Sequence, residues 1–97
     1  NVLAYDVQML IDVVDVWHID IKDMKSSKKS NDIVFPRQIA MYLCRSVANA
    51  SFPKIGDEFG KRDHTTVMHA FKKIDKEIKE NSNTKLIVDN VKKNLTA

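Results

Sequence analysis

Cysteine, glycine and proline are scarce in this chain, and each scarcity excludes a class of protein. The 97 residues include one cysteine, two glycines and two prolines. The single cysteine, Cys44, cannot form an internal disulfide or a zinc-binding cysteine pair, and it fits a small core residue in a reducing compartment. So few glycines and prolines do not suit an all-β domain, which must turn every few residues. No signal peptide or long apolar run is present, so we expect a cytoplasmic protein.

The motifs of common enzyme classes are also missing. The chain has neither the Gly-rich phosphate loop that ends in Gly-Lys-Ser/Thr nor a Gly-x-Gly-x-x-Gly turn, so nothing offers to hold a nucleotide. His64 and His69 are five residues apart with no glutamate between them, which is not the His-Glu-x-x-His zinc pattern. Thr66 and His69 have helical spacing, but they lack a third group to orient a base. We therefore predict a non-enzymatic domain without metal or cofactor.

The apolar residues that are present follow helical spacing along most of the chain. Residues three and four apart predict helices over about 5–17, 21–24, 36–50, 53–59 and 64–80, with a last helix after residues 81–83. The expected inner faces comprise Ile39, Ala40, Leu43, Val47 and Ala50, then Ile55 and Phe59, then Val67, Phe71, Ile74 and Ile78, and finally Leu86, Ile87, Val91 and Leu95. One all-α domain, a compact helical bundle over residues 1–97, is the predicted fold.

Helix boundaries can be read from residues that favour helix ends. Pro36 and Pro53 are expected to open their helices, because proline is favoured in the first helical turn. Gly60 is placed to end the short helix with a positive φ. Asp20 and Asp63 are natural N-caps for the helices that follow them.

Positive charge gives only weak support for an anionic partner. The formal net charge is +3, which is common in ordinary soluble proteins. The polar segment 25–32 carries three lysines and no apolar periodicity, so it is predicted to be a loop. It is either a solvated connector or a flexible arm that reaches DNA, and the sequence leaves both interpretations open.

Residues 55–74 carry the most information about function. They predict two helices joined by a tight turn, with short polar side chains crowded at the start of the second helix. A helix that enters the major groove needs such side chains for base edges, flanking cations for phosphates and an apolar back face. The polar run is Asp63-His64-Thr65-Thr66. The flanking groups are Lys61, Arg62, His69, Lys72 and Lys73.

Each polar side chain of this run has a plausible nucleic-acid role. Asp63 can accept a hydrogen bond from a cytosine amino group, and it can cap the helix at the same time. The Thr66 methyl group can lie against a thymine methyl, and His64 can contact a thymine through its ring edge or N–H. Thr65 and the free N–H groups of the first helical turn can donate to phosphate.

These residues resemble a known family. Ile55-Gly-Asp-Glu-Phe-Gly, Arg62-Asp-His-Thr-Thr-Val, His69-Ala and Lys73-Ile are similar to the signature of the C-terminal DNA-binding domain, domain IV, of the bacterial replication initiator DnaA. Pro36-Arg-Gln-Ile-Ala-Met-Tyr-Leu looks like the family's preceding helix. The resemblance implies a Trp-repressor-like helix-turn-helix over about residues 53–80. It also implies binding to DnaA boxes of the TTATNCACA type at the replication origin, in support of initiation.

The resemblance also assigns roles by position. It implies that Asp63, His64 and Thr66 meet bases in the major groove, and that Lys29, where the family more often has arginine, enters the minor groove. Lys61 stands where the family commonly has glycine. The implied phosphate contacts are Arg37, Gln38, Arg45, Thr65, His69 and Lys73, together with the backbone near Phe52 and Pro53.

The implied partners extend beyond DNA. The resemblance points to other replication initiation proteins, reached through domains absent from this chain, and to acidic membrane lipids. ATP is expected only in an absent AAA+ domain, and the isolated domain is expected to be a nucleoid-associated monomer. Two alternatives stay open: a helix-turn-helix transcriptional regulator, and a basic protein-interaction module that binds an acidic partner.

Overall fold

The computed structural model of the chain describes residues 21–26, 29–47 and 49–96, and every regular element in these ranges is a helix. The helices are α2 (Ile21–Met24), α3 (Asn31–Ser46), α4 (Phe52–Glu58), α5 (His64–Glu80) and α6 (Ser82–Thr96). The predicted helix over 5–17 and the predicted cap at Asp20 lie outside the described residues. In the described part, no helix is long and apolar enough to cross a membrane.

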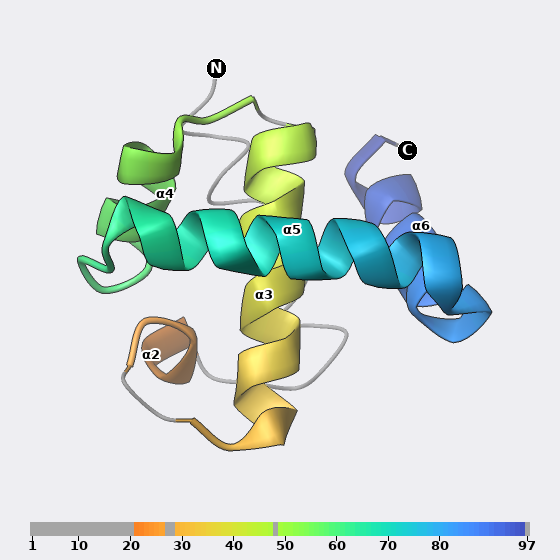
Figure 1. The fold of residues 1–97 in the computed structure, drawn as a ribbon, viewed down its shortest axis with the longest axis horizontal. Coiled ribbons are helices and arrows are strands. Elements are labelled where there is room, and N and C mark those ends of the chain that lie inside the picture. The colour runs from red at the N-terminus through yellow and green to blue at the C-terminus, as the bar shows by residue number, and fades with distance from the viewer. Residues whose placement is uncertain (1–20, 27–28, 48, 97) are drawn as a thin grey trace.

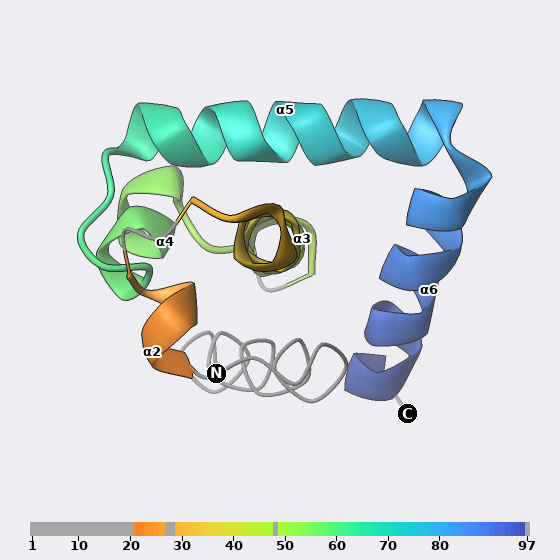
Figure 2. The same cartoon turned by 90° about the horizontal axis from the view of Figure 1, so that it is seen from below.

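Helix α3 occupies the middle of the arrangement. Helix α5 crosses it (Figure 1), and α4 lies beside α3 under the first part of α5 (Figure 2). After the end of α5 the chain turns sharply into α6, so that α5 and α6 cover two adjacent sides of α3 (Figure 2). The helices expected at 53–59 and 64–80 are thus adjacent and joined by a short turn.

The surroundings of α3 explain why it is buried more widely than its sequence pattern predicts. The pattern predicted one inner face with Ile39, Ala40, Leu43, Val47 and Ala50, and Val47 is only half-buried. The structure buries the whole segment 39–44, which includes Met41 and Tyr42. A helix that is covered on several sides is buried around most of its circumference.

The start of α3 corrects the prediction for Pro36. The helix begins at Asn31, so Pro36 lies inside it and does not open it. Ser30 takes the N-cap position with extended φ and ψ of −68° and 144°, and its carbonyl accepts from the N–H groups of Ile33 and Val34. Proline at position 36 removes the donor that would meet the carbonyl of Asp32, an exposed residue. The predicted loop 25–32 therefore ends two residues early.

Two glycines shape the connection between α4 and α5. Gly60 has a φ of 81°, as predicted, and a Cβ there would overlap the carbonyl oxygen of Lys25. Gly56 lies inside α4, where a Cβ would overlap the carbonyl oxygen of Arg62 in the turn. The N–H of Arg62 in turn donates to the Gly56 carbonyl at 2.8 Å. The turn can therefore pack directly against the helix backbone.

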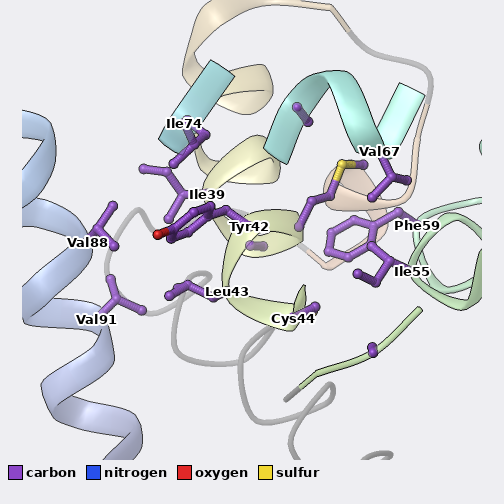
Figure 3. Packing of buried hydrophobic residues seen from close by; sticks show 14 residues of the cluster. Ile39, Tyr42, Leu43, Cys44, Ile55, Phe59, Val67, Ile74, Val88 and Val91 are labelled. Carbon is purple, nitrogen blue, oxygen red and sulfur yellow. The ribbon is translucent and has the colours of Figure 1, made fainter. Parts of the chain in front are cut away.

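The last helix differs from its prediction in the face that it buries. The break predicted at residues 81–83 is present, and Asn81 Oδ1 accepts from the N–H of Asn83 at 2.9 Å. Val88 and Val91 are buried, whereas Leu86, which the pattern placed on the inner face, is 60% exposed. Val88 points toward Ile39 of α3 (Figure 3), whereas Leu86 lies on the exposed side of α6.

The apolar core joins all of these elements (Figure 3). Val88 and Val91 of α6 point toward Leu43 and Ile39. On the other side of α3, Phe59 lies fully buried against the helix-turn-helix, with Ile55 and Val67 beside it in the figure. Burial of a phenylalanine side chain stabilises a fold by roughly 1.5–3 kcal/mol, so Phe59 helps to fix α4 against α5.

Lys61 adopts a backbone conformation that glycine would adopt more easily. Its φ is 59°, in the left-handed region. We expect Lys61→Gly to raise the free energy of unfolding by about 0.5–1 kcal/mol in urea titrations, because glycine has no Cβ to strain there. Lys61→Ala removes the same charge and keeps the strain, so it serves as the control. Equal stability of the two variants would contradict the prediction.

Candidate nucleic-acid interface

Asp63 caps the start of α5, as the sequence predicts. It takes the N-cap position with φ −61° and ψ 142°, and its Oδ1 accepts from the N–H of Thr65 at 2.8 Å. The Thr65 hydroxyl also donates to Oδ1. These two hydrogen bonds, first from the side chain and then from the backbone of Thr65, lower the pKa of Asp63. The carboxylate is thus ionised and oriented at neutral pH.

The side chains predicted to meet bases are open to solvent at this helix end. Asp63 and His64 are 66% and 57% exposed, and Thr66 is also exposed. His64 Nδ1 lies 3.5 Å from Asp63 Oδ1. The hydroxyl of Thr65 is directed to Asp63 in this arrangement, so a phosphate contact through that hydroxyl requires it to leave the cap.

A hollow of about 660 Å³ lies beside these residues, between α3 and the first half of α5. Every polar residue that lines it is among the predicted DNA contacts, although they come from three separate parts of the chain. Three apolar residues that were not predicted to contact DNA complete the lining. The lining comprises Val34, Arg37, Gln38, Met41, Arg62, Thr65, Thr66, His69, Ala70 and Lys73.

Gln38 brings an unused polar atom to the hollow. Its Oε1 is buried and meets no hydrogen-bond donor in the described part of the chain. An unsatisfied buried acceptor is unfavourable by about 1–3 kcal/mol. This oxygen gains only from a partner that donates a hydrogen bond, whereas a phosphate, which only accepts, would have to be met by the carboxamide N–H groups.

Arg37 is less accessible than its prediction as a phosphate contact suggests. It is 6% exposed, and its Nη2 donates to the carbonyl of Asp23 at 2.9 Å. Burial, and next the nearby Arg62 guanidinium, lower the pKa of Arg37. A guanidinium has five donors, so a phosphate contact would be added to this internal one.

Arg62 also makes contacts within the protein. Its Nη1 donates to the carbonyl of Phe59 and its Nη2 donates to the carbonyl of Ser26. Burial lowers its pKa. Sequence reasoning identified Arg62 as a charge near the helix start and missed these contacts. Ser26 is 36 residues away, and no local pattern signals such a pairing.

Arg45 and Pro53 lie apart from the hollow, near the start of α4. Arg45 Nη1 donates to the carbonyl of Ala50 at 3.2 Å, and its guanidinium lies 4.8 Å from the centre of the Phe52 ring. Pro53 is exposed in the first turn of α4, where Ser51 caps the helix by accepting from the N–H of Lys54.

Three of the predicted cationic contacts are exposed at the edges of this surface. Lys73 reaches the hollow from the second turn beyond Thr66, while Lys61 lies in the turn before α5. Lys29 is exposed in the loop before α3 and does not line the hollow. The structure thus places Asp63, His64 and Thr66 at the start of α5, and the predicted phosphate contacts on α3, on the first half of α5, at the start of α4 and on the adjoining turn.

Known proteins share this arrangement. The family model described as the bacterial DnaA protein helix-turn-helix matches residues 8–74. A crystal structure of a DNA replication initiation factor, 33% identical, matches 95% of this chain with a TM-score of 0.84. AMPPCP-bound DnaA from Aquifex aeolicus, 28% identical, matches 94% with a TM-score of 0.73. The chain spans 28% of the length of each of these two proteins.

Proposed function

The chain belongs to the family of the bacterial DnaA helix-turn-helix, and from this premise we propose that it binds double-stranded DNA at DnaA boxes of the replication origin. The family match confirms the all-α helix-turn-helix prediction, and such a domain binds its target without catalysing a reaction. The observation that carries the proposal is the gathering of the predicted contacts at the start of α5 and around one hollow.

In this proposal the first turn of α5 enters the major groove. Asp63, His64 and Thr66 are exposed there, and they offer a carboxylate, an imidazole and a methyl-bearing hydroxyl to base edges. The carboxylate adds selectivity because DNA phosphates repel it. A wrong base leaves that repulsion uncompensated, while a cytosine amino group offsets it.

The hollow beside α5 receives the DNA backbone. His69 and Lys73 are exposed on its α5 side, and Gln38 on its α3 side can donate from its amide when the carboxamide turns. Arg45 and the first turn of α4 near Pro53 lie apart from the hollow and hold further phosphates. These contacts set the register of the helix and carry no base information themselves.

Lys29 reaches the neighbouring minor groove at the AT-rich end of the box. Narrow AT-rich minor grooves have enhanced negative potential, which attracts an inserted cation. A lysine there supplies charge without the planar fork of arginine. Loss of Lys29 is therefore expected to affect the TTAT end of the box more than its CACA end.

A binding titration with two duplexes tests the proposal. We expect this chain to bind a TTATNCACA duplex at least 10³-fold more tightly than a scrambled duplex of equal composition at moderate salt. Titration at several salt concentrations separates the phosphate contribution, which both duplexes share. Equal affinity for the two duplexes would contradict the proposal and favour a basic interaction module.

A further inference from the structure

Arg62 connects two parts of the chain that the proposed function uses at different grooves. Its Nη1 donates to the Phe59 carbonyl at the end of α4, and its Nη2 donates to the Ser26 carbonyl in the loop after α2. The guanidinium thus spans the gap between the helix-turn-helix and the lysine-containing loop before α3, predicted at residues 25–32 and called the basic loop from here on. These bonds engage two of the five N–H donors of the guanidinium and direct its terminal nitrogens toward the protein backbone.

The same junction is closed by backbone packing and by a second arginine. Gly60 lies against the carbonyl of Lys25, with no room for a Cβ between them. Ser26 Oγ donates to the Asp23 carbonyl at 2.8 Å, and Arg37 Nη2 donates to that carbonyl at 2.9 Å. The beginning of the basic loop is therefore fixed to both α3 and the turn before α5.

The other end of the loop is fixed as well. Ser30 is the N-cap of α3, and its carbonyl accepts from Ile33 at 3.0 Å and from Val34 at 2.9 Å. Lys29 immediately precedes Ser30 and is three residues from Ser26. Because a chain extends by at most about 3.6 Å per residue, Lys29 stays within a short reach of both fixed points.

We propose that Arg62 is a positioning residue, which sets the place of Lys29 relative to the first turn of α5 and so joins the two groove contacts into one unit. This proposal rests on the proposed function. It assigns Arg62 a different role from the phosphate contact that its charge predicts. The proposal predicts that lysine cannot replace arginine at this position, because the single ammonium group of lysine lacks the planar fork that reaches both carbonyls.

The substitution Arg62→Lys separates a positioning role from a phosphate contact, because lysine retains the positive charge but lacks the planar guanidinium that reaches both carbonyls. Affinity is measured for the box, for a box altered in TTAT and for a box altered in CACA, at a temperature where all variants are folded. We expect discrimination at the TTAT end to fall about tenfold, with the CACA end and the salt dependence unchanged. Wild-type discrimination at both ends, or an equal loss at both ends, would overturn the proposal.

A double-mutant cycle gives a second test. If Arg62 acts through Lys29, Lys29→Ala loses affinity in the wild-type background and loses nothing further in the Arg62→Lys background. Independent, additive losses would overturn the proposal. Lys85→Ala is the matched control for removal of one lysine charge, because Lys85 is exposed on α6 and does not line the hollow.

Amide hydrogen exchange of the free domain tests, without DNA, whether Arg62 holds the basic loop against the helix-turn-helix. We expect Arg62→Lys to speed exchange in the Lys25–Ser30 segment while the middle of α5 stays protected. Unchanged exchange in that segment would overturn the proposal. If the wild-type chain fails to distinguish box from scrambled duplex, the proposed function fails, and the exchange result still decides whether Arg62 holds the loop.

Discussion

Gly56→Ala is expected to lower the free energy of unfolding by about 2–4 kcal/mol. Helix propensity predicts the opposite sign, because alanine inside a helix is favoured over glycine by about 1 kcal/mol. The geometry decides: a Cβ at position 56 would overlap the carbonyl oxygen of Arg62, a backbone atom that no rotamer change can move. Urea denaturation followed by helical circular dichroism measures the effect.

The displacement expected in this variant also reaches the candidate interface. Arg62 directly precedes Asp63, so a turn that moves away from α4 carries the N-cap of α5 with it. We expect the affinity of Gly56→Ala for the box duplex to be lower than that of wild type even under conditions in which the variant is fully folded. Asp57→Ala, at an exposed neighbouring position in α4, is the control and should stay within about 0.5 kcal/mol of wild type. A Gly56→Ala variant as stable as wild type would show that the turn relaxes freely.

The parts of the fold that sequence reasoning anticipated depend on local physical chemistry. Gly60 ends its helix with a positive φ and Asp63 caps the next one, as both residue types predict wherever they stand. The helix at Ile21–Met24 and the break near Asn81 were likewise predicted from neighbouring residues alone. Caps and breaks of this kind involve contacts within a few residues, which a sequence displays directly.

The errors have a common physical cause in tertiary packing. Pro36 favours a helix start, but α3 already begins at Asn31 and contains the proline in its interior despite the lost donor. Leu86 has the right spacing for an inner face, but the direction of α6 buries Val88 instead. Periodicity reports that one face is apolar, while the neighbouring helices determine which residues that face finally covers.

The sequence predicted which residues make up the candidate site, but it did not predict how they are arranged in space. Resemblance and charge indicated the residues that surround the hollow, yet nothing local indicated that α3 and α5 enclose it. The internal contacts of Arg37 and Arg62 were missed for the same reason, since their partners Asp23 and Ser26 lie far away in sequence. Two arginines that look like plain phosphate contacts in the sequence also donate to distant backbone carbonyls, Arg37 to that of Asp23 in α2 and Arg62 to that of Ser26.

Asp63 is expected to serve both folding and base selection, and two substitutions separate these roles. Asp63→Ala removes the cap and the carboxylate, so we expect the melting temperature to fall by roughly 5 °C and preference for the cognate base to fall roughly tenfold to hundredfold. Asp63→Asn keeps a capping oxygen, so we expect near wild-type stability with the same loss of base preference. Thermal melts and titrations with single-base box variants measure the two effects.

The pH dependence of stability adds a third readout for Asp63. Its pKa is lowered in the folded state by the hydrogen bonds from Thr65, so the cap contributes fully above the ordinary aspartate value of 3.8. That contribution is lost as the pH falls through the lower folded-state value. Asp63→Asn should remove this part of the acid dependence, because its amide does not titrate.

Lys73→Ala is the matched comparison for base selection. Lys73 lines the hollow on the same helix, so its loss should weaken binding to every duplex alike and lower the salt slope by about one. Asp63→Asn should instead change the ranking of box variants, because a carboxylate that accepts from a cytosine amino group acts on one base pair. If Lys73→Ala changed that ranking while Asp63→Asn preserved it, the assignment of base and phosphate contacts would be reversed.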